Sequence, residues 1–428
     1  MLLELKIKNY RSIKEKAIFS MVAESYRSKD VNVFTQTVTN DEPVRLLKAA
    51  AIWGANASGK TNVIRAVMCL IQLLKNPPEV EKPIEQYDPF QFSSETEHQP
   101  VCFFLSFIGT NQVRFEYQIA FNKVAIVEEA LNYYPNGNKK ACFYRAVGKS
   151  KKIDEGVMGT DWKKKKYDVY KNQLFLSQFG KNVADEILGS VYAYLTDLRV
   201  IHATDSNVLK VVNRDIAKKL LEKPELLQRL NKLISQVDIR VESVEIKAME
   251  KETFQFPKEL PSELVDEIFN QSKYQVFGKH KYYENGVFKR MESLHITKES
   301  HGTQNLFALG GYLFDALDEG AVVFMDELDA SLHPFVAKRI VELFQNEQTN
   351  PHHAQLIFTT HDTSLLDETI LRRDQVWFTE KDEFGATELY SLQDIEGVRE
   401  DSLFEKGYRA GKYKAIPKIP SLDYIFAV

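Results

Sequence analysis

The sequence predicts an α/β fold whose core is encoded at both ends of the chain and interrupted by a large insertion. Near the N-terminus, a mostly apolar run at residues 46–53 precedes a small-residue loop and a helical pattern of apolar residues from Val63 to Leu74. Toward the C-terminus, expected helices and short apolar strands alternate, at residues 303–318, 321–325, 332–344, 355–359 and 375–379. This alternation is typical of a mixed sheet with flanking helices, and the middle of the chain carries an α+β pattern instead.

The remaining elements follow from local patterns. Apolar and polar residues alternate over residues 1–20, which indicates one or two strands, and Pro77-Pro78 ends the first helix. In the middle we expect mainly helix at 174–236 and strands at 101–107, 113–121, 124–134, 239–256 and 274–294. Turns are expected at Asn136-Gly137 and at Glu284-Asn285-Gly286, and the tail after residue 398 is predicted to be irregular.

The expected organisation has four segments. These are an N-terminal lobe at 1–75, further core strands plus an inserted α+β region at 76–295, a C-terminal lobe at 296–400 and a basic tail at 401–428. The insertion lacks sustained heptads, so it is not expected to form a long coiled coil.

The composition is that of a soluble globular protein. The 428 residues, 44% of them apolar and 27% charged, suggest two or three domains and exclude disorder across the whole chain. Because 56 basic and 60 acidic side chains give a net charge of −4, no overall basic field draws the chain onto nucleic acid or a membrane.

The cysteines and the hydropathy pattern indicate a cytoplasmic protein. Cys69, Cys102 and Cys142 are too few and too widely spaced for a disulfide framework or a CxxC-type zinc site. They suit a reducing compartment. No stretch approaches the roughly 18 consecutive apolar residues of a membrane span, so we expect no membrane contact.

The strongest motif is a glycine loop between the first apolar strand and the first helix. Residues Gly54-Ala-Asn-Ala-Ser-Gly-Lys-Thr61 fit GxxxxGK[ST] without a mismatch. Glycines let backbone N–H groups surround phosphates, the helix N-terminus adds a positive dipole, the lysine reaches the outer phosphates and the hydroxyl holds Mg²⁺. A loop that merely turns the chain is the alternative, but the strand and helix around it favour a nucleotide. The expected nucleotide contacts are Gly54, Asn56, Ala57, Ser58, Gly59, Lys60, Thr61 and Asn62.

An acidic strand end can complete such a site. The apolar run Ala321–Met325 leads directly into Asp326 and Glu327. We expect Asp326 and Thr61 to hold Mg²⁺, and Glu327 to be the base that activates the attacking water. A solvated acidic turn is the alternative, and the glycine loop upstream favours the metal site.

Two further polar segments are placed to reach a bound nucleotide. His361 follows the apolar strand at 355–359, and a histidine at the C-terminal end of a core strand can touch a γ-phosphate, although a local capping role is the alternative. The loop Glu299–Thr303 precedes a helix that Ser300 or Thr303 can N-cap. A small polar loop at a helix N-terminus is also an anion cradle, which could close over a nucleotide held by another subunit.

In this order the segments resemble the ATP-binding-cassette pattern: glycine loop, serine–glycine loop, acidic strand, leucine–aspartate loop and histidine. The chain resembles the ABC-type ATPases of the SMC, RecF and OLD-like group. More narrowly, it resembles the stand-alone bacterial AAA-type ATPases of abortive-infection and RloA-type phage-defence systems. Ile7–Ile13 resembles the group's opening strand, and Glu299–Thr303 stands in for the signature loop. Lys406–Lys412, running to Pro417, resembles the tail of the RloA-like proteins, and motif similarity covers about 1–75 and 295–420.

The resemblance implies the P-loop NTPase fold of an ABC-ATPase head, with a large α+β insertion between the Walker A loop and the signature loop. It also implies a head-to-tail homodimer, or a higher oligomer, that sandwiches two ATP molecules with Mg²⁺. Each ATP would lie between the Lys60 loop of one subunit and Ser300 and Gly302 of the other.

The resemblance also implies individual roles. Glu327 would activate water, His361 would sense the γ-phosphate, and Asp329 would couple the two sites across the interface. Gln91 is the candidate for the family's Q-loop glutamine. We expect no nuclease module after His361.

One further segment is strongly basic. Residues 139–166 hold ten basic and three acidic side chains, with Tyr144, Trp162 and Tyr167 interleaved. Such a segment can contact nucleic acid, with bases stacked on the rings, and a solvated loop is an equal alternative. The candidate contacts are Lys151, Lys152, Lys163, Lys164, Lys165 and Lys166.

Three functions fit these observations. The first is an ATPase that acts as sensor or regulator in a bacterial anti-phage system and controls a separately encoded effector, such as a nuclease or a toxin. The second is a RecF-like DNA-repair or recombination ATPase. The third is a scaffold that holds ATP without turnover and clamps a toxin. We favour the first because the narrower resemblance is to defence ATPases.

Overall fold

The computed structural model describes residues 1–26, 28–147, 152–153, 169–181, 186–203, 206–237, 240–257, 259–330 and 332–417. They fall into two compact units. The first comprises Met1–Val200, Gly320–Asp326 and the chain from Val341 onward, and the second comprises Ile201–Glu319 and Glu327–Ile340. The chain therefore leaves the first unit twice and returns to it twice.

A six-stranded sheet carries the glycine loop. Its strands, in spatial order, are β11 (Arg199–His202), β15 (Val322–Asp326), β16 (Gln355–Thr359), β5 (Ala49–Gly54), β17 (Val376–Lys381) and β18 (Thr387–Ser391). The strands β15, β16, β5 and β17 pair in parallel, and β18 is antiparallel to β17. Because parallel strands end at the same edge of a sheet, Gly54, Asp326 and Thr359 share one edge.

A seven-stranded antiparallel sheet forms the second layer of the first unit. Its strands, in spatial order, are β10 (Lys152–Ile153), β9 (Lys140–Ala146), β8 (Ile126–Tyr134), β7 (Arg114–Phe121), β6 (Val101–Ile108), β1 (Leu2–Lys8) and β2 (Ala17–Ser20). A separate hairpin pairs β3 (Val33–Gln36) with β4 (Val44–Leu47).

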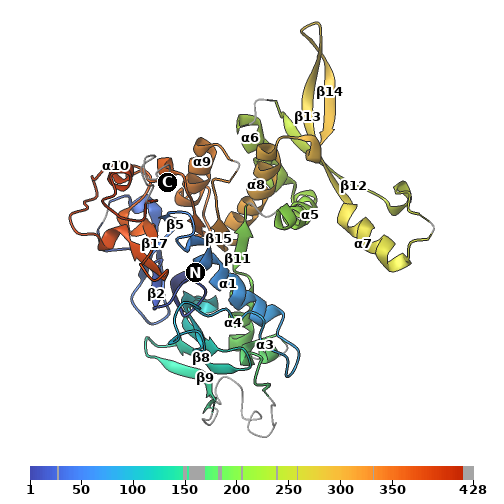
Figure 1. Cartoon of the computed structure of the whole chain (residues 1–428). Coiled ribbons are helices and arrows are strands. Elements are labelled where there is room, and N and C mark those ends of the chain that lie inside the picture. Colours follow the sequence, from blue (N-terminus) through green and yellow to red (C-terminus); the bar gives the residue numbers. More distant parts are fainter. Residues whose placement is uncertain are drawn as a thin grey trace, which may run out of the picture. The chain divides into compact units, whose positions relative to one another are not determined.

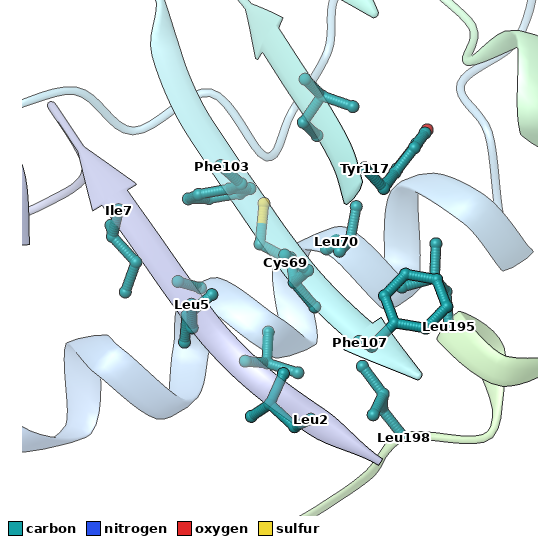
Figure 2. Packing of buried hydrophobic residues seen from close by; sticks show 14 of the residues in the cluster. Leu2, Leu5, Ile7, Cys69, Leu70, Phe103, Phe107, Tyr117, Leu195 and Leu198 are labelled. Carbon is teal, nitrogen blue, oxygen red and sulfur yellow. The ribbon is translucent and has the colours of Figure 1, made fainter. Parts of the chain in front are cut away.

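The helix α1 (Lys60–Lys75) packs its apolar stripe into the main core of the first unit. Figure 2 shows Cys69 and Leu70 of α1 beside Leu5 of β1 and Phe103 of β6, with Leu195 of α4 nearby. The predicted helical spacing from Val63 onward is confirmed, because the residues of that stripe are buried. The other helices that lie in or reach this unit are α3 (Phe175–Phe179), α4 (Glu186–Thr196), α9 (Pro334–Gln345) and α10 (Phe404–Arg409).

The second unit is built around three helices and a small sheet. Its elements are α5 (Ser206–Glu222), α6 (Pro224–Val237), β12 (Ser243–Ala248), α7 (Ser262–Ser272), β13 (Tyr274–Glu284), β14 (Val287–His295) and α8 (His301–Glu319). The helices α5 and α6 lie against α8, and the ribbon of β13 and β14 extends from them (Figure 1). Lys219 of α5 and Lys223, the residue after α5, both form ion pairs with the buried Asp315 of α8. These ion pairs fix α5 on α8.

The structure corrects several predicted elements. The apolar run at 46–53 is two strands, β4 and β5, because the buried Lys48 between them donates from Nζ to the carbonyls of Val31 and Gln345. The helical stretch at 174–236 contains β11, and the tail predicted to be irregular contains α10. Only 243–248 of the predicted strand at 239–256 is a strand. The pattern also missed β3, β18 and α7, which are short or exposed and carry weak periodicity.

In the described part of the chain, Cys69, Cys102 and Cys142 form no disulfide with one another. Burial raises the pKa of the Cys69 and Cys102 thiols, so both remain protonated at neutral pH. Among the described residues, no helix has the length and apolar character that crossing a membrane requires.

A buried carboxylate ties the antiparallel sheet to the segment that begins α3. Glu129 of β8 is fully buried, and it accepts hydrogen bonds from Tyr117 Oη (2.8 Å) and Arg145 Nε (2.8 Å). The backbone N–H groups of Phe175 (2.7 Å) and Leu176 (3.0 Å) also donate to it. Each of these donors would lose its partner without the carboxylate.

We therefore expect Glu129→Ala to lower the free energy of unfolding by about 3–5 kcal/mol, because it leaves the Arg145 charge buried and unpaired. Urea denaturation followed by circular dichroism measures the change. The neighbouring Glu128→Ala is the control, since Glu128 is only half-buried and should change stability by less than about 1 kcal/mol. Equal effects of the two variants would contradict this role for Glu129.

Candidate nucleotide-binding site

The glycine loop connects β5 to α1 and needs glycine at two positions. Gly59 has φ 110°, and a Cβ there would lie 2.2 Å from Thr387 Oγ1. Gly54 has φ 157°, and a Cβ there would lie 2.5 Å from Ser58 Oγ. Both the backbone conformation and the close approach of neighbours therefore exclude larger residues.

A network of hydroxyl groups holds this loop. Ser58 Oγ lies 2.6 Å from Thr379 Oγ1, and Thr387 Oγ1 donates to the Ser58 carbonyl at 2.8 Å. Ser12 Oγ lies 2.7 Å from Thr387 Oγ1 and accepts from Asn62 Nδ2 at 2.7 Å. These bonds link the glycine loop to the turn after β1, to the start of α1, and to β17 and β18.

The lysine of the motif is drawn into the loop. Lys60 is only 6% exposed, and its Nζ donates to the carbonyls of Gly54 (2.9 Å) and Ala55 (3.1 Å). Since α1 begins at Lys60 with Gly59 as its N-cap, no side chain of the cap covers the first N–H groups of the helix. An uncovered helix N-terminus beside an ammonium group suits an anionic ligand.

A carboxylate from β15 lies at the start of α1. Asp326 is 6% exposed, and its Oδ1 accepts from Thr359 Oγ1 at 2.6 Å and from Thr61 Oγ1 at 3.2 Å. A hydroxyl and a carboxylate side by side are hard oxygen donors, which are the ligands that Mg²⁺ prefers. The side chains of Thr61 and Asp326 therefore fit the metal that accompanies a nucleoside triphosphate.

His361 follows the end of β16 and is exposed, while Thr359 and Thr360 before it are buried. The segment beyond it is anchored, because Trp53 Nε1 donates to the Asp362 carbonyl at 3.0 Å. The parallel pairing of β16 with β5 places His361 at the same sheet edge as the glycine loop.

Two predicted residues belong to the second unit and follow β15 in the chain. Glu327 has φ 57°, a left-handed conformation that costs a residue with a side chain about 1–2 kcal/mol. The turn is closed by Ala330 N–H donating to the Glu327 carbonyl at 2.9 Å, and the fully buried Leu328 anchors it. Asn305 of α8 donates to the Ala330 carbonyl at 3.4 Å, which connects α8 to the loop that carries Asp329.

The loop before α8 lies in the same unit. Ser300 is exposed, and its Oγ accepts from the Thr303 N–H at 3.1 Å, so the predicted N-cap is confirmed. Gly302 is half-buried in the first turn of α8. The 19 residues of α8 direct the positive end of the helix dipole at this loop.

The candidate Q-loop residue Gln91 is exposed and lies near the turn that carries Ser12. The Phe90 N–H donates to Asn9 Oδ1 at 3.1 Å, and the Arg11 N–H donates to the Asp88 carbonyl at 2.8 Å. These bonds hold the segment of Gln91 against the turn after β1; its role stays a prediction.

The basic segment is only partly described. Arg145 is buried on Glu129, so its charge serves the fold, whereas Lys139 pairs with Glu116 at 2.7 Å while its side chain is 55% exposed. Lys151 and Lys163–Lys166 lie outside the described residues, as do Trp162 and Tyr167, and of Lys152 only the backbone, in β10, is described.

Sequence reasoning missed four residues that shape the site: Ser12, Thr359, Thr379 and Thr387. Thr359 is the polar last residue of a correctly predicted buried strand, and that position was the available indication. Ser12 lies within the opening motif Ile7–Ile13. Thr387 begins β18, which the pattern did not predict, so no sequence feature indicated it.

Comparison with known proteins agrees with this geometry. The family described as "AAA domain, putative AbiEii toxin, Type IV TA system" matches residues 49–367, well over half of the chain. The chain therefore belongs to this AAA family, whose description agrees with the predicted resemblance to abortive-infection ATPases. The mixed sheet that carries the glycine loop confirms the predicted α/β fold class. No curated protein shows a significant match.

Several solved structures resemble the chain at low identity. The SMC head domain from Thermotoga maritima is 13% identical with a TM-score of 0.38, over 91% of this chain and 98% of that chain. The Smc head domain from Pyrococcus furiosus, solved with an extended coiled coil and bound to the C-terminal domain of ScpA, is 12% identical with a TM-score of 0.38, over 96% and 98%. The recombination mediator protein RecF with ATP is 14% identical with a TM-score of 0.38, over 91% and 97%.

The steric limits at Gly59 generate a direct test. We expect Gly59→Ala to weaken nucleotide binding at least tenfold, because the added Cβ displaces Thr387 and the backbone is strained at φ 110°. Titration with a fluorescent ATP analogue measures the affinity. Gly189→Ala on α4 is the control, since a Cβ there meets nothing within 4 Å. Wild-type affinity in Gly59→Ala would contradict the assignment of the loop.

Proposed function

We propose that the chain binds Mg²⁺ and ATP at the loop Gly54–Thr61 and hydrolyses the nucleotide. The observation that carries the proposal is the placement of Asp326 Oδ1 within hydrogen-bonding distance of both Thr61 and Thr359, at the sheet edge where the glycine loop begins. Phosphoryl transfer depends on positioning and on charge stabilisation, and this edge offers both.

Each group around the loop has a task in this proposal. Thr61 and Asp326 would hold Mg²⁺, which supplies charge neutralisation on the phosphate oxygens. The N–H groups from Gly54 to Thr61, including those of Asn56, Ala57 and Ser58, surround the phosphates, and Lys60 exchanges its carbonyl partners for phosphate oxygens. Asn62 keeps the first turn of α1 on Ser12, and thereby keeps these donors aligned.

Glu327 and His361 act on the reacting end of the nucleotide. Glu327 accepts the proton of the attacking water. Its backbone, at φ 57°, has a conformation that favours glycine, and a glutamate in such a strained position supports a functional role for its side chain. His361 hydrogen-bonds the γ-phosphate from the end of β16, and Gln91 contributes a further polar contact there.

A second copy of the chain completes the site in this proposal. Ser300 and Gly302 of one copy present the N-terminus of α8 to the γ-phosphate held by the other copy. The hydrogen bond from Asn305 to Ala330 joins α8 to the loop of Asp329, and this supports Asp329 as the residue that couples the two sites.

We place this switch in the bacterial cytoplasm, as the sensor or regulator of an anti-phage system of the abortive-infection type. The support is the family's own description, which names an abortive-infection toxin and a toxin–antitoxin system. In this proposal a separately encoded nuclease or toxin acts as the effector.

Glu327→Gln separates turnover from scaffolding. We expect it to reduce ATP hydrolysis at least a hundredfold, because the amide cannot accept a proton, while ATP binding is retained and an ATP-bound dimer accumulates. Phosphate release and light scattering with ATP measure the two effects. Lys60→Ala is the companion variant, and it should lose binding and dimer formation together. A wild-type protein without turnover, unchanged by Glu327→Gln, would favour the scaffold.

Ser300 tests the contribution of the second copy. We expect Ser300→Tyr to leave ATP binding to the single subunit intact but to block the ATP-dependent dimer, because the ring fills the space that the phosphate needs. Ser300→Thr keeps the N-cap of α8 and serves as the control. ATP-dependent dimerisation of Ser300→Tyr at wild-type strength would contradict the composite site without affecting the assignment of the loop.

A further inference from the structure

The outer edge of β14 is a long unpaired strand edge. β12 pairs only with Tyr274–Lys279 of β13, so the ribbon continues beyond it as two strands, and β14 is the last strand of its sheet. All residues from Val287 to Ser293 are exposed. Within the part of the chain that the structure describes, no strand pairs with this edge. An exposed edge of this length presents free N–H and C=O groups and is a template for another strand.

The ladder shows which residues of β14 direct their main-chain groups outward. The N–H groups of Met249 and Glu242, at the two ends of β12, donate to the carbonyls of Lys273 and Lys279. The main-chain groups of the odd-numbered residues of β13 therefore point to β12, and those of the even-numbered residues point to β14. Tyr282 of β13 is opposite Arg290 of β14, so Arg290 and Glu292 use their main-chain groups inside the ribbon. The N–H and C=O groups of Met291 and Ser293 therefore point to the free edge.

The charges along β14 are self-complementary. Arg290 and Glu292, the neighbours of Met291 in the chain, point to the same face of the strand, opposite to Met291. Arg290 Nε donates to Glu292 Oε2 at 2.9 Å. Their side chains are 62% and 55% exposed, so both charges are available to a neighbour.

Lysines of the ribbon also have acidic partners. Lys281 pairs with Glu242 at 2.7 Å, and Lys289 pairs with Glu284 at 3.4 Å. A ribbon whose positive charges are paired in this way has no basic field for a polyanion, which argues against nucleic acid and for a protein strand.

We propose that the β14 edge pairs antiparallel with the β14 edge of a second copy of this chain, about a two-fold axis at Met291. In this register the two Met291 residues exchange main-chain hydrogen bonds. Arg290 of each copy lies opposite Glu292 of the other, at the non-hydrogen-bonded positions where side chains approach most closely. The pairing also brings the two Met291 side chains together across the axis, and each is 42% exposed in the single chain.

This contact goes beyond the proposed ATPase because it requires no nucleotide. A two-fold contact of this kind uses the same surface on both copies. Together with an ATP-dependent contact elsewhere on the chain, it would join copies into assemblies larger than a dimer.

Charge reversal tests both the contact and its register, using light scattering on the full chain without nucleotide over a range of concentrations. We expect the wild type to dimerise. Arg290→Glu and Glu292→Arg should each weaken the dimer by roughly tenfold or more, because each sets two like-charged pairs across the two-fold axis. The double variant Arg290→Glu/Glu292→Arg should restore the dimer, and so should an equimolar mixture of the two single variants.

Lys281→Glu is the matched control, because it makes the same change in net charge on the inner strand β13 and should leave the dimer intact. Lys60→Ala should also retain this dimer, so loss of nucleotide binding and loss of the strand contact are distinguishable. A wild type that is monomeric without nucleotide overturns the proposal. Single variants that dimerise like the wild type, or a double variant as weak as the single ones, overturn the register.

Discussion

The carboxylate of Asp326 is the interaction on which the arrangement of the site depends. Its Oδ1 accepts from Thr61 at the start of α1 and from Thr359 at the end of β16, so one oxygen joins a helix and two strands that are distant in sequence. The group is almost fully buried, and its hydrogen bonds offset the cost of removing a carboxylate from water. A metal bound between Thr61 and Asp326 would take up the same oxygen atoms, so the fold and the chemistry use one feature.

The loop itself is held from outside by neutral hydroxyl groups. Thr379 and Thr387 bond to Ser58, and Ser12 bonds to Thr387 and to Asn62, so these short bonds limit the movement of the loop. Neutral donors of this kind position backbone N–H groups without neutralising the positive charge of Lys60. Preorganisation at an anion site is effective because the groups need not rearrange when charge develops.

The second unit combines a rigid part with an exposed part. Asp315, which is nearly inaccessible to solvent, forms ion pairs with Lys219 and Lys223. These ion pairs hold α5 against α8, the helix that follows the loop of Ser300. The ribbon that precedes this loop is instead exposed along β14. His280 of β13 lies 2.7 Å from Oε1 of Glu299, so the base of the ribbon contacts the residue beside Ser300. A partner bound at the ribbon would therefore adjoin the segment assigned to the second half of the ATP site.

Local features of this protein follow from short stretches of its sequence. The motif Gly54–Thr61, the apolar stripe of α1 and the acidic end of β15 could be predicted, because glycine spacing, helical periodicity and an apolar run followed by acids are encoded in adjacent residues. The tertiary structure alone fixes which hydroxyl groups surround the loop, because strand order brings Ser12 to Thr387, 375 residues away in the sequence. The tertiary structure also places Arg145 on a buried carboxylate, because burial depends on what packs around a charge. It leaves the edge of β14 unpaired in the described structure, because strand pairing is a property of the whole sheet.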